Sequence, residues 1–175
     1  MTATTRRGLL VAAVGTTGAS GLAAALRTQL LLLSCDEAVL ARSRSYSLRT
    51  RALVTTLRDH ARAHVTALRD AGARGGGSVL SPGPALDRAL ARERITGRPD
   101  HLRGERDALN LLLDAERVAI GAAYLALGEV HDPATSTLLA QLMASGAQHE
   151  AALHLALHPG DIAGAIPYGI VQGVR

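Results

Sequence analysis

Apolar residues recur every three or four positions over four long segments of the chain, and this spacing is the period of an amphipathic α-helix. The pattern predicts long helices over about residues 26–47, 49–71, 102–127 and 133–157. Asp132 is suited to cap the last of them, since Pro133 follows at the first helical position, where an amide hydrogen is not needed. A shorter helix is predicted over residues 85–95.

The segment between the second and third long helices interrupts the helical period. Residues 72–84 are rich in glycine and proline and are predicted to form a loop, the preferred site of proteolytic cleavage. Residues 159–175 show no helical period and are predicted to form an irregular tail. Two helical hairpins joined by a long crossover are typical of a four-helix bundle, so the sequence predicts an all-α fold with its bundle in residues 26–158.

The N-terminus has the pattern of an export signal. Arg6 and Arg7 precede residues 8–26, which contain only Gly, Ala, Ser, Thr, Val and Leu, and small residues fill positions 23–25. A basic start, an apolar stretch and small residues are the parts of a signal peptide. The paired arginines indicate the twin-arginine type. Residues 1–25 are therefore predicted to be a signal segment that contacts the membrane transiently and directs the protein to the cell envelope or outside the cell.

Two alternatives to a cleaved signal stay open. The first is a basic N-terminus followed by a short buried helix. The second is a membrane anchor, either because the signal segment is retained or because residues 32–35, which faintly resemble a lipoprotein cleavage box, direct lipidation of Cys35.

Composition agrees with a helical protein and argues against nucleic-acid binding. Hydrophobic residues make up 47% of the 175-residue chain, while Phe and Trp are absent. An Ala- and Leu-rich core suits close-packed helices better than a sheet. All 19 basic residues are arginine, but acids are interspersed with them and aromatics are too few to stack on bases, so no nucleic-acid partner is expected. A single cysteine excludes an internal disulfide.

Polar side chains interrupt the apolar stripes of all four long helices. The five residues concerned are Glu37, His60, His64, Glu116 and His149. An unpaired buried carboxylate is costly, so such groups are normally paired with each other or bound to a metal ion. We therefore expect His149 to face the interior near Glu116 and His64, whereas Glu150, His154 and His158 fall on another face of their helix and are predicted to be solvated.

Three stretches resemble the ferritin-like superfamily, in particular the bacterial exported ferritin-like domain proteins. They are LRDHARAHVTALRDAGA at residues 57–73, DAERVAIGAAYLAL at residues 114–127 and DPATSTLLAQLMASGAQHEAALH at residues 132–154. The resemblance spans about residues 29–158 and implies a ferritin-like four-helix bundle. Di-metal sites of this superfamily take a Glu from each of two helices and a Glu-x-x-His motif from each of the other two.

The resemblance implies an incomplete set of metal ligands. Four residues match ligand positions of the family: Glu37, Glu116, His64 and His149. Ala61 and Gly146, however, stand three residues before the two histidines, where the family has its bridging glutamates. A di-iron centre and the oxygen chemistry that depends on it are therefore not expected.

A smaller metal site is compatible with the remaining residues. His60 and His64 are four residues apart and project from one helical face, as in helical zinc sites. Together with His149 and Glu116 they would supply nitrogen and oxygen ligands for one Zn, Fe or Mn ion. A zinc-protease motif is excluded, because Ala61 and not Glu follows His60. The alternative is a core in which Glu and His pair by hydrogen bonds.

Two functions follow from these alternatives. One is an exported ferritin-like protein with a single metal ion in its core, acting in metal handling or oxidative protection. The other is a non-catalytic structural or partner-binding bundle that has lost the di-metal site. No catalytic residue is assigned, and a homo-oligomer is compatible with both.

Overall fold

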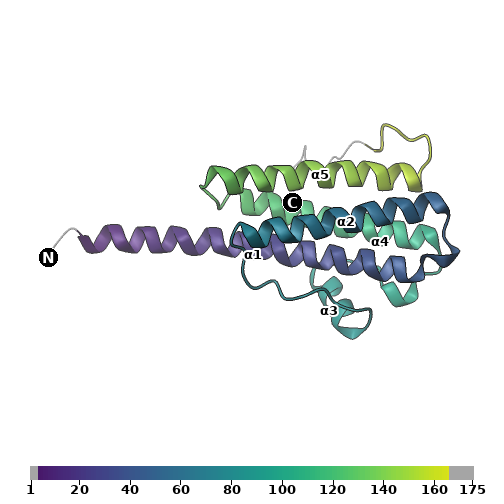
Figure 1. Ribbon diagram of the computed structural model, residues 1–175, viewed down its shortest axis with the longest axis horizontal. Helices are drawn as coiled ribbons and strands as arrows, with labels where there is room; N and C mark the ends of the chain where they lie inside the picture. Colours follow the sequence, from purple (N-terminus) through teal and green to yellow (C-terminus); the bar gives the residue numbers. More distant parts are fainter. Residues whose placement is uncertain (1–3, 166–175) are drawn as a thin grey trace.

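The computed structural model describes the backbone of residues 4–165 and the side chains of residues 19–165. Its helices are α1 (Thr4–Arg42), α2 (Leu48–Asp70), α3 (Pro84–Arg92), α4 (Glu105–Leu127) and α5 (Pro133–Leu157), with 3-10 turns η1 (Ser43–Ser45) and η2 (Pro99–His101) (Figure 1). No strand occurs in residues 4–165. The all-α prediction is confirmed over this part of the chain.

The four long helices pack side by side; α1 and α2 are antiparallel, as are α4 and α5, whereas the long crossover makes α2 and α4 parallel (Figure 1). α1 packs extensively against both α4 and α2, α5 packs extensively against α4, and α5 and α2 touch over a much smaller area. α3 lies outside this group and packs on α1. Aliphatic side chains from all four long helices fill the interior; among the most deeply buried are Leu26, Leu32, Leu57, Leu112, Leu139 and Leu153.

Side-chain caps define where α2 and α5 begin. Asp132 accepts a hydrogen bond from the Thr135 amide at 2.8 Å, as predicted for the start of α5. Ser47 caps α2 by accepting from the Thr50 amide at 3.2 Å. Glu105, the first residue of α4, in turn accepts from the amide of Ser47 at 2.8 Å and from its hydroxyl at 3.0 Å. The start of α2 is therefore tied to the start of α4.

The crossover between α2 and α4 is held against α1. Gly76 has φ +59°, and a Cβ atom at this position would lie 2.9 Å from Cγ of Leu26, so glycine satisfies both the backbone and the packing. The Leu80 amide donates to the Ser34 hydroxyl at 2.9 Å. The predicted loop over residues 72–84 is confirmed. It is held against α1 by packing and by a hydrogen bond, and does not extend freely into solvent.

The first long helix begins earlier than predicted. α1 starts at Thr4 and continues through residue 25 without a break. Leu22 and Ala25 belong to the same buried core as Leu26, with 9%, 1% and 2% of their surfaces exposed. The start predicted at residue 26 is therefore wrong, because a stretch of Gly, Ala, Thr and Leu serves an export signal and a close-packed helix equally well.

Parts of the predicted terminal segments lie outside the described residues. This applies to the side chains of the Arg6–Arg7 pair and to residues 166–175 of the predicted tail. Within the described part of the chain, no helix combines the length and the apolar character needed to cross a lipid bilayer.

Candidate functional site in the helix core

His149 is the centre of a hydrogen-bonded chain that joins three helices. Its ring lies on α5 with 6% of the residue exposed. Its Nδ1 is 2.7 Å from Oε1 of Glu116 on α4, and its Nε2 is 2.8 Å from Nδ1 of His60 on α2. The Ser145 hydroxyl is a further neighbour of Nε2, at 3.3 Å. When Glu116 is ionised, Nδ1–H of His149 donates to it, and Nε2 is left to accept from His60 or Ser145.

Glu116 is the deepest member of this chain. Only 1% of the residue is exposed, and burial raises the pKa of its carboxyl group, while the hydrogen bond with His149 opposes that rise. The imidazole therefore provides the partner that a buried carboxylate requires. The predicted proximity of Glu116 and His149 is confirmed.

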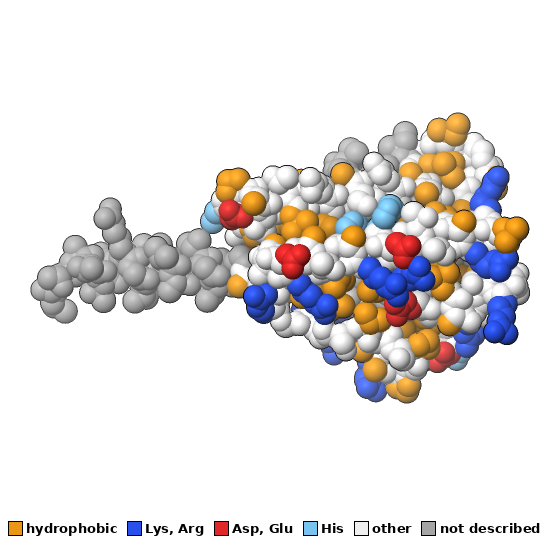
Figure 2. Space-filling view, in the orientation of Figure 1, with side chains coloured by type: hydrophobic (Ala, Val, Ile, Leu, Met, Phe, Trp, Pro, Cys, Tyr) orange, Lys and Arg blue, Asp and Glu red, His pale blue; other side chains and the backbone are white. Residues whose placement is uncertain are grey.

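The three histidines form a graded series from solvent to core. His60 is exposed, His64 is intermediate and His149 is buried. The rings of His60 and His149 stack with centroids 5.1 Å apart, and those of His64 and His149 are 6.3 Å apart. Figure 2 shows histidine side chains reaching the surface near the middle of the visible face. The site is therefore reached from the α2 side of the molecule.

His64 is the least satisfied of the three histidines. Its Nδ1 is buried and has no hydrogen-bond partner. Burial, followed by the neighbouring charges of His149 and His60, lowers the pKa of His64 from 6.5 to about 4. The side chain is therefore neutral at physiological pH and keeps a lone pair available.

Asp36 is the carboxylate that sequence reasoning missed. The residue lies on α1 with no exposed surface, and neither of its carboxylate oxygens has a partner. Burial, and next the charge of Glu116, raises the pKa of Asp36 well above its usual range. The spacing gave no signal that singles it out, since apolar residues stand four before and three after both Asp36 and Glu37. Asp36, and not Glu37, is nevertheless the acidic residue that α1 contributes to the site.

Glu37 lies outside the cluster, so its predicted position on the inner stripe is wrong. Its carboxylate accepts from Nη2 of Arg62 at 2.7 Å, and 37% of its side chain is exposed. The leucines at residues 30–33 are all buried, so the apolar pattern of α1 does not define a single inner face that would place Glu37 on it. Glu37 forms a surface ion pair between α1 and α2.

Glu150 is a second correction, because it was predicted to be solvated and is 7% exposed. Its carboxylate accepts from Nε of Arg117 at 2.8 Å. The arginine comes from α4, so this contact could not be predicted from the pattern of residues along α5. His154, which was placed on the same solvated face, is only partly exposed and its Nε2 lies 3.1 Å from the Asp161 carboxylate.

The positions of the two absent glutamates are closed by packing. A Cβ atom at Gly146 would lie 2.6 Å from Cγ1 of Ile120 and 3.6 Å from Oε2 of Glu116. Any side chain there would require Ile120 to move. Ala61, on α2, is 1% exposed and belongs to the apolar core. The interior is therefore built around small residues at both places.

These observations test whether the metal centre implied by the ferritin-like fold fits this chain. A centre with two metal ions does not fit, because one bridging position is filled by Ile120 and both nitrogens of His149 already have protein partners. Among the described residues, no three His, Cys, Asp or Glu side chains converge closely enough to hold a metal ion. The unpartnered atoms of Asp36 and His64 nevertheless supply the kind of oxygen and nitrogen donors that a single ion uses.

Cys35 lies next to Asp36 in the middle of α1 and is completely buried. Burial, followed by the charge of Asp36, raises the pKa of its thiol. A lipid on this sulfur would require Cys35 to leave the packed position that it occupies in this structure.

The ferritin-like domain family matches residues 11–159, which is most of the chain, and the protein belongs to this family. The match begins inside the predicted signal segment, consistent with the packing of Leu22 and Ala25 in the core. No curated protein and no solved structure matches the chain. The resemblance read from residues 57–73, 114–127 and 132–154 is thus confirmed at the level of the family.

Proposed function

We propose that this chain is an exported ferritin-like four-helix bundle without a di-metal centre, acting as a non-catalytic structural or partner-binding protein. The observation that carries the proposal is the closure of the core at Gly146, where a Cβ atom would stand 2.6 Å from Ile120. A side chain at this position would require Ile120 to move, so the core as it is packed has no room for a bridging carboxylate there.

The hydrogen-bonded chain supports the same proposal. Glu116 and His149 form a hydrogen bond of 2.7 Å, and His60 provides a hydrogen-bond partner for the other ring nitrogen of His149 at 2.8 Å. A buried polar group with a protein partner stabilises the native state, whereas removal of that partner leaves a costly unsatisfied atom. The residues left from the family's site therefore have a structural role of their own.

A second candidate function is a single-metal bundle, and the unpartnered atoms of Asp36 and His64 favour it. These two residues with Glu116 and His149 would offer two carboxylates and two imidazoles from four helices, a donor set suited to Zn, Fe or Mn. Binding would require His149 to give up one of its present hydrogen bonds and the side chains to move together, since no three of them converge closely enough in the described structure.

Metal content and thermal stability separate the two functions, and the chain offers a matched pair of variants. Asp36→Asn alters the carboxylate that faces the core, and Glu37→Gln alters its neighbour on the surface. We expect purified protein to hold no stoichiometric metal and to melt at the same temperature with and without chelator. One ion per chain that is lost in Asp36→Asn and kept in Glu37→Gln would establish the single-metal function instead, since ligands that bind only the native state raise its stability.

We further propose export by the twin-arginine route, supported by Arg6 and Arg7 before a stretch of small and apolar residues. The Arg6→Lys/Arg7→Lys double variant should remain in the cytoplasm, whereas wild-type protein leaves it. Unchanged export of the variant would exclude this route.

A further inference from the structure

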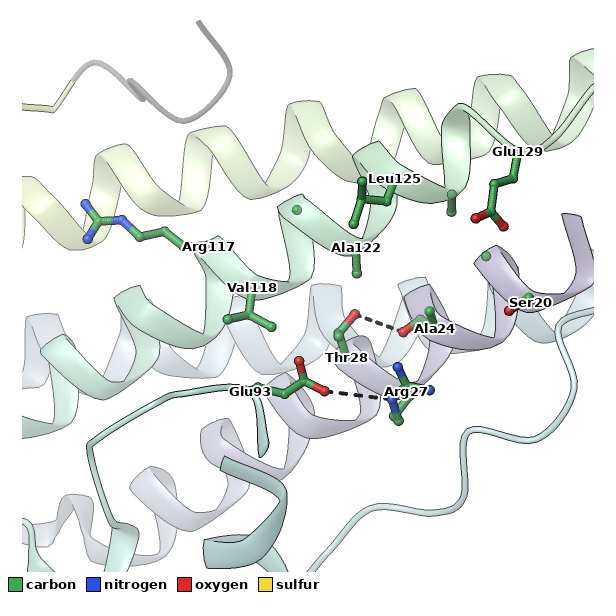
Figure 3. A pocket seen from close by; sticks show the side chains of 13 residues that line it. Ser20, Ala24, Arg27, Thr28, Glu93, Arg117, Val118, Ala122, Leu125 and Glu129 are labelled. Carbon is green, nitrogen blue, oxygen red and sulfur yellow. Dashed lines mark hydrogen bonds and ion pairs between the residues drawn. The ribbon is translucent and has the colours of Figure 1, made fainter. Parts of the chain in front are cut away.

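A groove of about 470 Å³ runs between α1 and α4, away from the hydrogen-bonded chain of the core (Figure 3). Its floor is made of small side chains on both helices, among them Gly21, Ala24 and Ala122. Leu125 stands at its edge with 63% of the residue exposed. The groove thus presents a hollow and a protruding apolar side chain on one face.

The α4 side of this groove is a ridge of three residues spaced four apart, Arg117, Gly121 and Leu125. Glu129 also lines the groove and lies in the turn two residues beyond the end of α4. Rows of this spacing form the ridges that interdigitate when two helices pack. The three helical residues span about 12 Å at the rise of an α-helix. Figure 3 shows Arg117 and Glu129 at opposite ends of the labelled row, with Leu125 between them.

The order of these residues makes the ridge complementary to a copy of itself. In an antiparallel pair of α4 helices related by a two-fold axis at the level of Ala123, Leu125 of each copy faces Gly121 of the other. The same register brings Arg117 of each copy toward the turn that carries Glu129 of the other. A two-fold interface requires this kind of self-complementarity, because one surface meets itself. A single register therefore satisfies the packing and the charges together.

The charges at the two ends are available for such contacts. Glu129 makes no ion pair within the described residues. Arg117 donates a hydrogen bond to Glu150 through Nε and has a longer ion pair with Asp114 at 3.9 Å, while 53% of its side chain is exposed. A guanidinium group has five N–H donors, so its outer edge can engage a second carboxylate.

We propose that this face of α4, with the adjoining flank of α1, binds a second copy of the chain and forms a two-fold symmetric dimer. Leu125 fills the hollow over Gly121 of the partner copy, and Arg117 and Glu129 pair across the two ends. This inference goes beyond the proposed function and is independent of whether the core holds a metal ion.

Light scattering of the full chain over a wide concentration range tests the proposal. Wild-type protein should have twice the mass of one chain, and Leu125→Glu should weaken self-association by roughly 30-fold or more, the range of a central interface residue. Gly121→Leu should have a similar effect by filling the hollow, and Glu129→Arg a smaller one by opposing like charges. Circular dichroism checks that each variant keeps its helices.

Leu48→Glu is the matched control, because Leu48 is 76% exposed and lies at the start of α2, remote from the ridge. It should leave the mass of the dimer unchanged. If wild-type protein is a monomer at every concentration, the groove does not bind a second copy and the proposal is overturned. A dimer that Leu125→Glu and Glu129→Arg do not weaken would place the interface on another face and overturn it equally.

Discussion

The packing interface (seam) between α1 and α4 differs from the seam between α2 and α5. α1 and α4 pack closely over a long distance, and a Cβ atom at Gly21 would lie 3.0 Å from Cα of Ala126. α2 and α5 touch over a small area, where His60 bonds to and stacks on His149. One seam depends on small residues and the exclusion of water, and the other on polar groups near solvent.

The difference explains where polar groups are tolerated in this fold. An imidazole at the loosely packed seam reaches water and protein partners at the same time, so a hydrogen-bonded chain extends from solvent to Glu116. Asp36 on α1 shows the contrast, because its buried carboxylate has no partner and its charged form is disfavoured. The candidate site therefore occupies the side of the molecule with the weaker helix–helix packing.

Removal of residues 1–25 should produce the largest effect, because it takes Leu22 and Ala25 from the close seam. We expect a chain that begins at residue 26 to lose roughly 2–5 kcal/mol of stability in urea unfolding, the range for deleting one large buried side chain. A chain that begins at residue 19 keeps Leu22 and Ala25 and should therefore be more stable than the chain that begins at residue 26. Mass spectrometry of exported protein should correspondingly find an N-terminus upstream of Gly21; a stable protein that starts at residue 26 would contradict this prediction.

His149→Ala should have the next largest effect, since it breaks the polar chain at its centre. Glu116 would remain buried without its partner, at an expected loss of about 1–3 kcal/mol in chemical unfolding. The loss should be equal with and without added metal or chelator. A loss that appears only when metal is supplied would support the single-metal function.

The pH dependence of stability should report on His64. Its folded pKa of about 4 lies below the unfolded value of 6.5, so between these pH values the unfolded chain binds a proton that the folded chain does not. Stability from this residue is therefore complete above pH 6.5 and falls as the pH drops toward 4. After allowance for its partial exposure, we expect a contribution of about 1 kcal/mol.

The matched variant is His64→Gln, which cannot titrate. The fall in stability between pH 7 and pH 4, measured by urea unfolding, should be shallower in this variant than in the wild type. Asp36 and Glu116 act in the opposite direction, because their raised pKa values stabilise the fold at low pH, and both are present in the two proteins compared. Equal slopes would show that His64 is not held in its neutral form.

The surface pair between Arg62 and Glu37 should give the smallest effect. Both side chains are substantially exposed, at 54% and 37%, so solvent screens their attraction. Arg62→Ala should change the stability by less than about 0.5 kcal/mol, and added salt should remove most of that difference. A loss comparable with that of His149→Ala would mean that the edge of the α1–α2 packing contributes more than its exposure indicates.

The sequence predicts the helices well and the inner face of α1 poorly, and the reason is physical. Residues 30–33 are four consecutive leucines, and all of them are buried with 6% or less of their surface exposed. A helix that is apolar around its circumference carries little information about its rotation. Asp36 and Glu37 could therefore not be distinguished by hydrophobic period, although one is buried and the other lies at the surface.

α2 and α4 have clear apolar and polar faces, and the positions of His64 and Glu116 follow from their patterns. Glu150 was not predictable from α5, because the arginine that makes its burial tolerable comes from α4. The boundary between the signal segment and the bundle could not be located from the sequence either. Small apolar residues suit a cleaved signal and a closely packed helix equally. Contacts between helices, and not patterns within them, decide these cases.

The cap of α2 by α4 has a consequence for the order in which structure forms. The hydroxyl group of Ser47 holds the Thr50 amide, and Glu105 holds Ser47 from a position 58 residues further along the chain. The full set of hydrogen bonds at the first turn of α2 can therefore form only once α4 has docked, although α2 is synthesised much earlier. Exchange of the Thr50 amide with deuterium should accordingly follow the opening of α4, so that two helices distant in sequence lose protection as one cooperative unit.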